Sequence, residues 1–290
     1  GGMAKKKKKL ENLPEGMTRR EAKLAARAAA RAELDREPRP FGGLAVEAEL
    51  IALQEFVPSA CARTKLVDGT EFTLGTVLPG AVAAYVTEDG ERFVALQTTS
   101  HSQNRGRDLA FVLNWLKDAA PGSTLESARN DGSQPELKEI FNPESIEVVN
   151  QETFEWWPGN LDANTLARFN DSIVPSFPVT PSAWWVDAGD KAHIRWVRTD
   201  EEQPLLDALA RVSAAGNLNL GENTKFAGVF RTHGVLVPVF DLDPAAGHDY
   251  ADQLAEVDAH ITKALAVDAP LTSEERRALE NIKSRQVTIR

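Results

Sequence analysis

Polar side chains that can bind an anion gather in one segment, TTSHSQNRGRDLAFVLNWL (98–116), where a predicted strand leads into a predicted helix. A helix begins with backbone N–H groups that lack intrahelical partners, so nearby guanidinium and hydroxyl groups complete a set of anion donors. The spacing matches no nucleotide-binding motif, and polar connections of this kind also occur without a ligand. The candidate anion-binding residues are Ser100, His101, Ser102, Asn104, Arg105 and Arg107.

A second pair of candidate residues, Asp241 and Asp243, follows the apolar run in VPVFDLDPAAGHD (237–249). The spacing resembles the strand-end DxD of haloacid-dehalogenase-type phosphatases, in which one aspartate is the phosphoryl nucleophile and the second is the acid/base. Only about 40 residues follow this segment, too few for the remaining motifs of such an enzyme. A metal site with His248 and Asp249 is an alternative, but we favour a helix-capping turn, because aspartate is common at caps.

Other signatures of chemistry are missing from the sequence. It contains no HxH, HExxH or Cys/His pattern for zinc, no GxSxG nucleophile motif, and no P-loop or Rossmann fingerprint. The single cysteine, Cys61, cannot form an internal disulfide, which fits a reducing, cytoplasmic setting. The sequence therefore predicts no catalytic residue, no metal and no cofactor.

The N-terminal segment is strongly basic, although the whole chain has a formal net charge of −10. Residues 1–40 contain twelve Lys or Arg and six Asp or Glu, a net charge of +6, which leaves −16 for the rest of the chain. Such an asymmetry indicates an arm that contacts an anionic surface.

An alanine-rich stretch in this arm, MTRREAKLAARAAARAELDRE (17–37), predicts a helix. Thr18 and Glu21 have the spacing of a capping box at its start, and the prolines of REPRP end it. Cations at every fourth position form one winding stripe, because four residues exceed one helical turn by only about 40°. The alternative is a solvated helix beside a lysine run that serves only solubility. The expected nucleic-acid-binding residues are Lys5, Lys6, Lys7, Lys8, Lys9, Arg19, Arg20, Lys23, Arg27 and Arg31.

Three segments of the body share one pattern: two apolar, β-rich runs joined by a glycine-containing turn, and then an amphipathic helix. The hairpins are expected at 83–97, 183–198 and 226–241. Further expected elements are helices at 45–56 and 271–286 and a strand at 70–78. Helices that cover mainly antiparallel sheet define an α+β fold. We divide the chain into a basic arm (1–39), a first α+β half (40–150) and a second α+β half with a C-terminal helix (151–290).

Six tryptophans offer large rings that can anchor a partner or fill a core. In AWWVD (183–187), neighbouring side chains of a strand point to opposite faces. One of Trp184 and Trp185 is therefore expected in the core, and the other toward solvent or a second layer. We favour packing over partner binding for these rings.

Four segments carry a resemblance to a known family: RPFGGLAVEAELIALQEFVPSA, HIRWVRTDEEQPLLDALARVSAAG, FRTHGVLVPVFDL and LTSEERRALENIKSRQVTIR. They resemble an uncharacterised family of cytoplasmic actinobacterial proteins, and the resemblance runs from Arg39 to Arg290. Some relatives carry an N-terminal zinc-binding SEC-C segment of the CPCGSG type, which also occurs in the SecA translocase, so they are labelled translocase-related. The lysine run and the Ala/Arg helix replace that segment here, so the resemblance implies neither a zinc site nor a catalytic residue.

These observations predict a non-enzymatic, cytoplasmic binding protein. Its basic arm docks on RNA, the ribosome or another polyanion, and its acidic α+β body contacts a protein partner. SEC-C segments are associated with ribosomes and translocation machinery, so by analogy a basic N-terminal module in the same position is expected to serve for docking as well. One alternative is an enzyme or sensor for a small anionic ligand that uses the 100–107 loop with His193 or His233; another is a pure protein–protein adaptor. No apolar stretch approaches the roughly 20 residues that cross a membrane.

Overall fold

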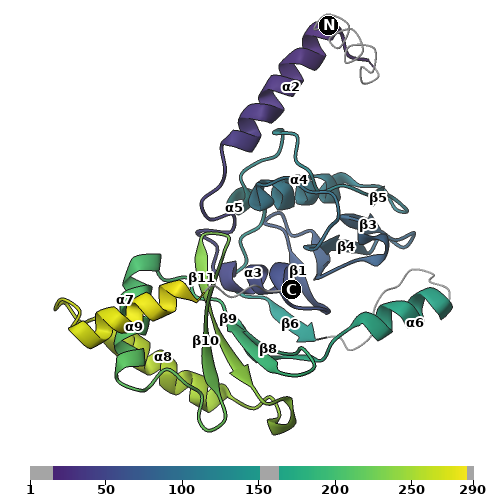
Figure 1. The fold of residues 1–290 in the computed structure, drawn as a ribbon. Helices are drawn as coiled ribbons and strands as arrows, with labels where there is room; N and C mark the ends of the chain where they lie inside the picture. Colours follow the sequence, from purple (N-terminus) through teal and green to yellow (C-terminus); the bar gives the residue numbers. More distant parts are fainter. Residues whose placement is uncertain (1–15, 151–162, 286–290) are drawn as a thin grey trace, which may run out of the picture.

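The computed structural model describes residues 16–150 and 163–285, and it begins with an isolated helix, α2 (Arg19–Leu34). The hydroxyl of Thr18 accepts a hydrogen bond from the Glu21 amide at 3.2 Å, which caps the first turn. Figure 1 shows α2 projecting away from the rest of the chain. The helix predicted from the alanine-rich stretch is therefore confirmed.

The first half of the body contains a six-stranded sheet with the strand order β5-β3-β4-β2-β1-β6. β2 and β4 pair in parallel, whereas the other neighbouring strands pair antiparallel. Helices α4 and α5 lie beside this sheet (Figure 1). The elements are α3 (Glu47–Glu55), β1 (Ala60–Lys65), β2 (Glu71–Gly75), η1 (Pro79–Ala81), β3 (Ala84–Val86), β4 (Arg92–Ala95), α4 (Arg105–Asp118), β5 (Thr124–Leu125), α5 (Leu137–Ile140) and β6 (Glu147–Asn150).

The second half contains a five-stranded antiparallel sheet with the strand order β10-β11-β9-β8-β7. Helices α7, α8 and α9 pack together on one side of it (Figure 1). The elements are α6 (Ala163–Ser172), β7 (Ser176–Thr180), β8 (Ala183–Asp187), β9 (Ala192–Trp196), α7 (Glu202–Ala214), β10 (Lys225–Thr232), β11 (Val235–Leu242), η3 (Pro244–Ala246), α8 (Ala251–Leu265) and α9 (Ser273–Ser284).

The central strands of the second sheet are buried on both faces, which explains the run of apolar residues along β11. One face contributes Trp184 and Val237 to the core that also contains α3 and the first sheet. The opposite face contributes Trp185 to a core with α7, α8 and α9. Both rings are almost completely buried, so packing against two layers is confirmed for this pair, and the second ring does not face solvent.

The α+β class and the three hairpin–helix units are confirmed. The first hairpin, β3–β4, belongs to the first sheet and is followed by α4. The second and third hairpins, β8–β9 and β10–β11, share the second sheet through the pairing of β9 with β11. Among the residues that the structure describes, no helix is both long and apolar enough to span a bilayer.

Candidate nucleic-acid interface and its junction with the body

The basic stripe of α2 lies on an exposed helix. Arg19, Lys23, Arg27 and Arg31 are all exposed, and so is Arg20. None of these five side chains forms an ion pair or hydrogen bond with the part of the chain that the structure describes. The stripe spans roughly 18 Å from Arg19 to Arg31 at the rise of an α-helix. The predicted contacts of Lys5 to Lys9 lie outside the described residues.

A short segment that we name the strap, residues 35–40, connects α2 to the body. The carboxylate of Glu37 lies at the start of α4, where its Oε2 accepts hydrogen bonds from the amides of Gly106 (3.0 Å) and Arg107 (3.4 Å). These amides are among the N–H groups that a helix leaves without intrahelical partners. Burial raises the pKa of Glu37, although both amides and the guanidinium of Arg107 favour its charged form. An acidic side chain of the chain itself thus occupies this helix start.

Asn104 and Arg107 hold the strap from the body side. The amide oxygen of Asn104 accepts a hydrogen bond from the Glu37 backbone N–H at 3.0 Å, and its Nδ2 donates to the Asp35 carbonyl at 3.3 Å. Arg107 donates from Nη1 to the same carbonyl at 3.1 Å and from Nη2 to the Asp35 carboxylate at 3.3 Å. Two of the predicted anion-binding side chains therefore bind the strap.

Ser102 of the 100–107 loop belongs to a hydrogen-bond network around the buried carboxylate of Asp108, and Ser100 forms a separate bond nearby. Asp108 accepts hydrogen bonds from the amide of Ser102 at 2.8 Å and from its hydroxyl at 2.7 Å. Asn130 adds its backbone amide at 2.9 Å and its side-chain amide at 2.8 Å. The hydroxyls of Ser100 and Ser127 lie 2.7 Å apart. This network gives the loop a fixed shape without an external ligand.

The remaining two loop residues, His101 and Arg105, lie near Glu55 at the end of α3. Glu55 also hydrogen-bonds with Nε2 of His233, in the β10–β11 turn of the second half. Burial opposes the charge of Glu55, but His233, Arg105 and His101 together lower its pKa. Arg105 donates to the Leu96 carbonyl at 2.8 Å, and burial lowers the pKa of its guanidinium. His233, which the sequence offered as a partner of this loop, thus joins it through a carboxylate.

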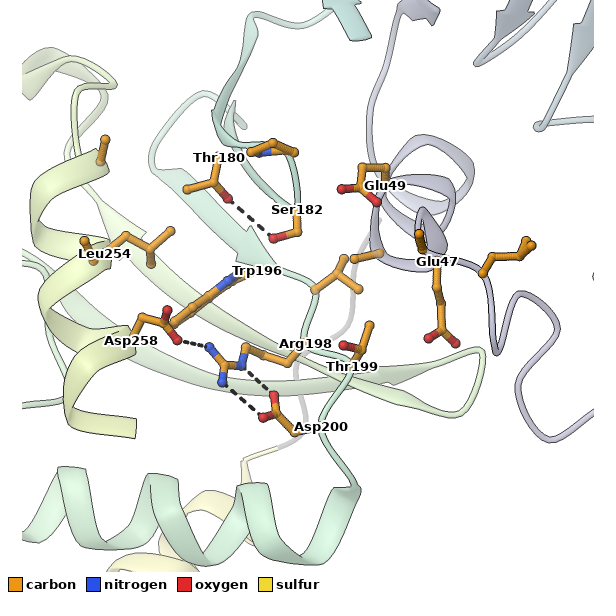
Figure 2. A pocket seen from close by; sticks show the side chains of 17 residues that line it. Glu47, Glu49, Thr180, Ser182, Trp196, Arg198, Thr199, Asp200, Leu254 and Asp258 are labelled. Atoms are coloured by element: carbon orange, nitrogen blue, oxygen red, sulfur yellow. Dashed lines mark hydrogen bonds and ion pairs between the residues drawn. The ribbon is translucent and has the colours of Figure 1, made fainter. Parts of the chain in front are cut away.

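A cavity of about 590 Å³ opens between α3, the β7–β8 turn, the end of β9 and α8 (Figure 2). Arg198 lies over the Trp196 ring at 4.5 Å and binds Asp200 and Asp258. Burial alone would lower the pKa of Arg198, but the two aspartates raise it.

The opposite wall of this cavity carries Glu47 and Glu49 (Figure 2). Glu47 is paired with Arg39 of the strap. Burial raises the pKa of Glu49, whose Oε2 has no hydrogen-bond partner among the residues described. Three of the four carboxylates are thus paired with the guanidinium groups of Arg39 and Arg198, and we assign the cavity no ligand.

The residues of the DxD-like segment do not converge. Asp241 bonds with Nδ1 of His193 at 2.8 Å, whereas Asp243 caps η3 by accepting from the Ala245 amide at 2.9 Å. The His248 ring stacks on Phe177 with centroids 3.9 Å apart. The favoured capping turn is therefore confirmed for Asp243. Within residues 16–150 and 163–285, no cluster of three or more His, Cys, Asp or Glu side chains could hold a metal ion.

Sequence reasoning missed the acidic residues that organise this junction, namely Glu37, Asp108 and Glu55. A weak signal was available for Asp108, because an acidic residue in the first turn of a helix favours its start. No comparable signal exists for Glu37 or Glu55, because their partners are distant in the sequence.

Comparison with known proteins identifies the family of the body. A family model described as "Family of unknown function (DUF5926)" matches residues 40–290. No curated protein and no solved structure matches the chain. The predicted membership of an uncharacterised family is confirmed, whereas its SEC-C and actinobacterial associations stay predictions. Because the match covers most of the chain, the protein belongs to the DUF5926 family of unknown function.

Proposed function

We propose that this protein is a non-enzymatic, cytoplasmic binding protein whose basic arm docks on RNA, with ribosomal RNA as the leading candidate. One observation carries the proposal: the cationic stripe of α2 is exposed on a projecting helix and is unpaired within the described chain. Lysines and arginines clustered along one face of a helix, and not neutralised by carboxylates of their own protein, can neutralise the phosphates of a partner.

The geometry of α2 supports a backbone contact rather than base reading. Its cations recur every four residues, about 6 Å along the helix axis, so several phosphates of one strand can be met in succession. The residues outside 1–40 carry a net charge of −16 and would be repelled by RNA. A helix of about 24 Å keeps most of that charge away from the phosphates. The acidic body then remains available to a protein partner.

The test is cosedimentation with purified bacterial ribosomes at low salt. The arm variant replaces Arg19, Lys23, Arg27 and Arg31 with glutamine. The control variant replaces four exposed cations of the body, Arg63, Lys65, Lys225 and Lys263, so both variants lose the same charge.

The proposal predicts that the wild type and the control sediment with ribosomes and that the arm variant stays in the supernatant. Equal sedimentation of both variants would contradict docking through α2. Binding of the wild type, but not of the arm variant, to ribosomal RNA freed of protein separates an RNA partner from an acidic protein.

A further inference from the structure

The strap makes contacts that go well beyond joining α2 to the body. Arg39 donates from Nε to Glu47 of α3 at 2.9 Å and forms a second bond to the same carboxylate. Its Nη2 also donates to the Thr199 carbonyl in the second half at 3.4 Å. Phe41, which follows the strap, is fully buried in the core that α3 and the first sheet share with one face of the second sheet. The segment therefore touches α4, α3 and the second half within a few residues.

Two glycines let the strap lie directly against the body. A Cβ atom on Gly106, in the first turn of α4, would lie 2.1 Å from the Pro40 carbonyl oxygen. A Cβ atom on Gly234, in the β10–β11 turn, would lie 2.1 Å from the Pro38 carbonyl oxygen, and Gly234 also has a φ of +78°. Each half thus has a site without a side chain where the strap backbone is seated.

We infer that the strap is a clamp that holds α2 in one direction and joins the two halves, with Glu37 as its latch. The latch combines a carboxylate, two helix-start amides, the Asn104 amide and the Arg107 guanidinium. Hydrogen bonds to a charged group are stronger than neutral ones, so the Glu37 contacts are among the strongest that hold the strap, together with the Arg39–Glu47 pair. The inference concerns the geometry of the arm and does not depend on what α2 binds.

A fixed direction has a mechanical consequence for the arm. A helix on a flexible tether would sample many directions, whereas a helix on a clamp keeps its cationic stripe in one orientation to the body. Opening the latch would free α2 to swing and would also release the amides of Gly106 and Arg107. A change at the junction that breaks the Glu37 contacts would therefore change the orientation of α2 relative to the body.

The first experiment measures the arm's direction without any ligand. Spin labels at Lys23→Cys on α2 and Lys117→Cys on α4 report one distance by double electron–electron resonance, in a Cys61→Ala background. The clamp predicts a single narrow distance distribution, a several-fold broader one for Glu37→Ala, and an unchanged one for Arg36→Ala, the control. Arg36 is exposed and makes no hydrogen bond within the described residues. A broad distance distribution in the protein that retains Glu37, or a narrow one in Glu37→Ala, would overturn the inference.

The second experiment uses limited trypsin digestion, which reads local opening. Asn104→Ala leaves the cleavage sequence unchanged but removes the bonds to the strap backbone. The clamp predicts that cleavage after Arg36 becomes about tenfold faster, as expected when a hydrogen-bonded segment opens more often. Cleavage after Lys23 and Arg27 in the exposed helix serves as the internal control and should not change. An unaltered rate after Arg36 would contradict the clamp.

Discussion

The substitution Gly106→Ala distinguishes the effect of helix propensity from that of the close contact between the strap and α4, because the two predict changes in protein stability of opposite sign. Alanine is the better helix former, so propensity alone predicts that the variant gains up to about 1 kcal/mol. The structure places the new Cβ 2.1 Å from the Pro40 carbonyl oxygen and 2.9 Å from the Pro40 carbonyl carbon. Since these are backbone atoms, the strap must move away from α4.

The size of the loss follows from the contacts that this movement breaks. Overpacking costs about 1–3 kcal/mol, and each lost hydrogen bond to the Glu37 carboxylate adds about 1.5–3 kcal/mol if it is not remade. With one of these bonds lost and both costs near the lower end of their ranges, a propensity gain of up to about 1 kcal/mol leaves a net destabilisation of about 2 kcal/mol. For a chain of this size, the unfolding temperature would fall by about 4–8 °C.

Urea unfolding followed by circular dichroism measures the change. The control is Asn114→Ala on the same helix, since the Asn114 side chain makes no hydrogen bond within the described chain and the substitution reports propensity alone. We expect the control midpoint to hold or rise and the Gly106→Ala midpoint to fall. A Gly106→Ala midpoint equal to or above that of the wild type would refute the close seating of the strap.

Three further predictions concern other parts of the fold. Glu55→Gln should lose about 2 kcal/mol at pH 7, because it removes the charged partner of His233. Since the pKa of Glu55 is lowered, its contribution is complete above the ordinary glutamate pKa of about 4.3 and is lost as pH falls through its folded pKa. The difference in stability between the wild type and Glu55→Gln should therefore shrink as the solution is acidified through that folded pKa, and a constant difference would contradict this. Thr272→Ala should destabilise by about 1 kcal/mol in thermal unfolding, because Thr272 and Glu275 form a capping box at α9, and an unchanged melting temperature would argue against that cap. Arg195→Met should stabilise the protein by on the order of 1 kcal/mol in urea unfolding. Arg195 is 7% exposed, and its Nε has no hydrogen-bond partner among the described residues. A loss of stability in the variant would contradict an unpaired buried charge at this position.

Elements with local signals were predictable from the sequence. The N-caps of α2 and α9, the glycine turns of the three hairpins and the helical periods depend on residues a few positions apart. The division of the hairpins between two sheets was not predictable, because it depends on which strand edges meet after folding.

The junction around the strap was predictable only in part. The sequence indicated a surplus of anion donors at the start of α4, and the structure places the Glu37 carboxylate against two of its amides. The bonds that build this junction join residues 67 apart for Glu37 and Asn104, and 178 apart for Glu55 and His233. No periodicity or spacing rule reports contacts at such separations, so the prolines of the strap indicated only the end of a helix.

The salt dependence of ribosome binding tests the central claim, that the stripe of α2 neutralises phosphates, most directly. Binding constants are measured for the wild type, the Arg19/Lys23/Arg27/Arg31→Gln variant and the matched body variant across a salt series. Each phosphate contact contributes about 0.7–0.9 to the slope of log K against log salt. The account predicts a slope shallower by about 3 for the arm variant and unchanged for the body variant. Equal slopes for the wild type and the arm variant would contradict it.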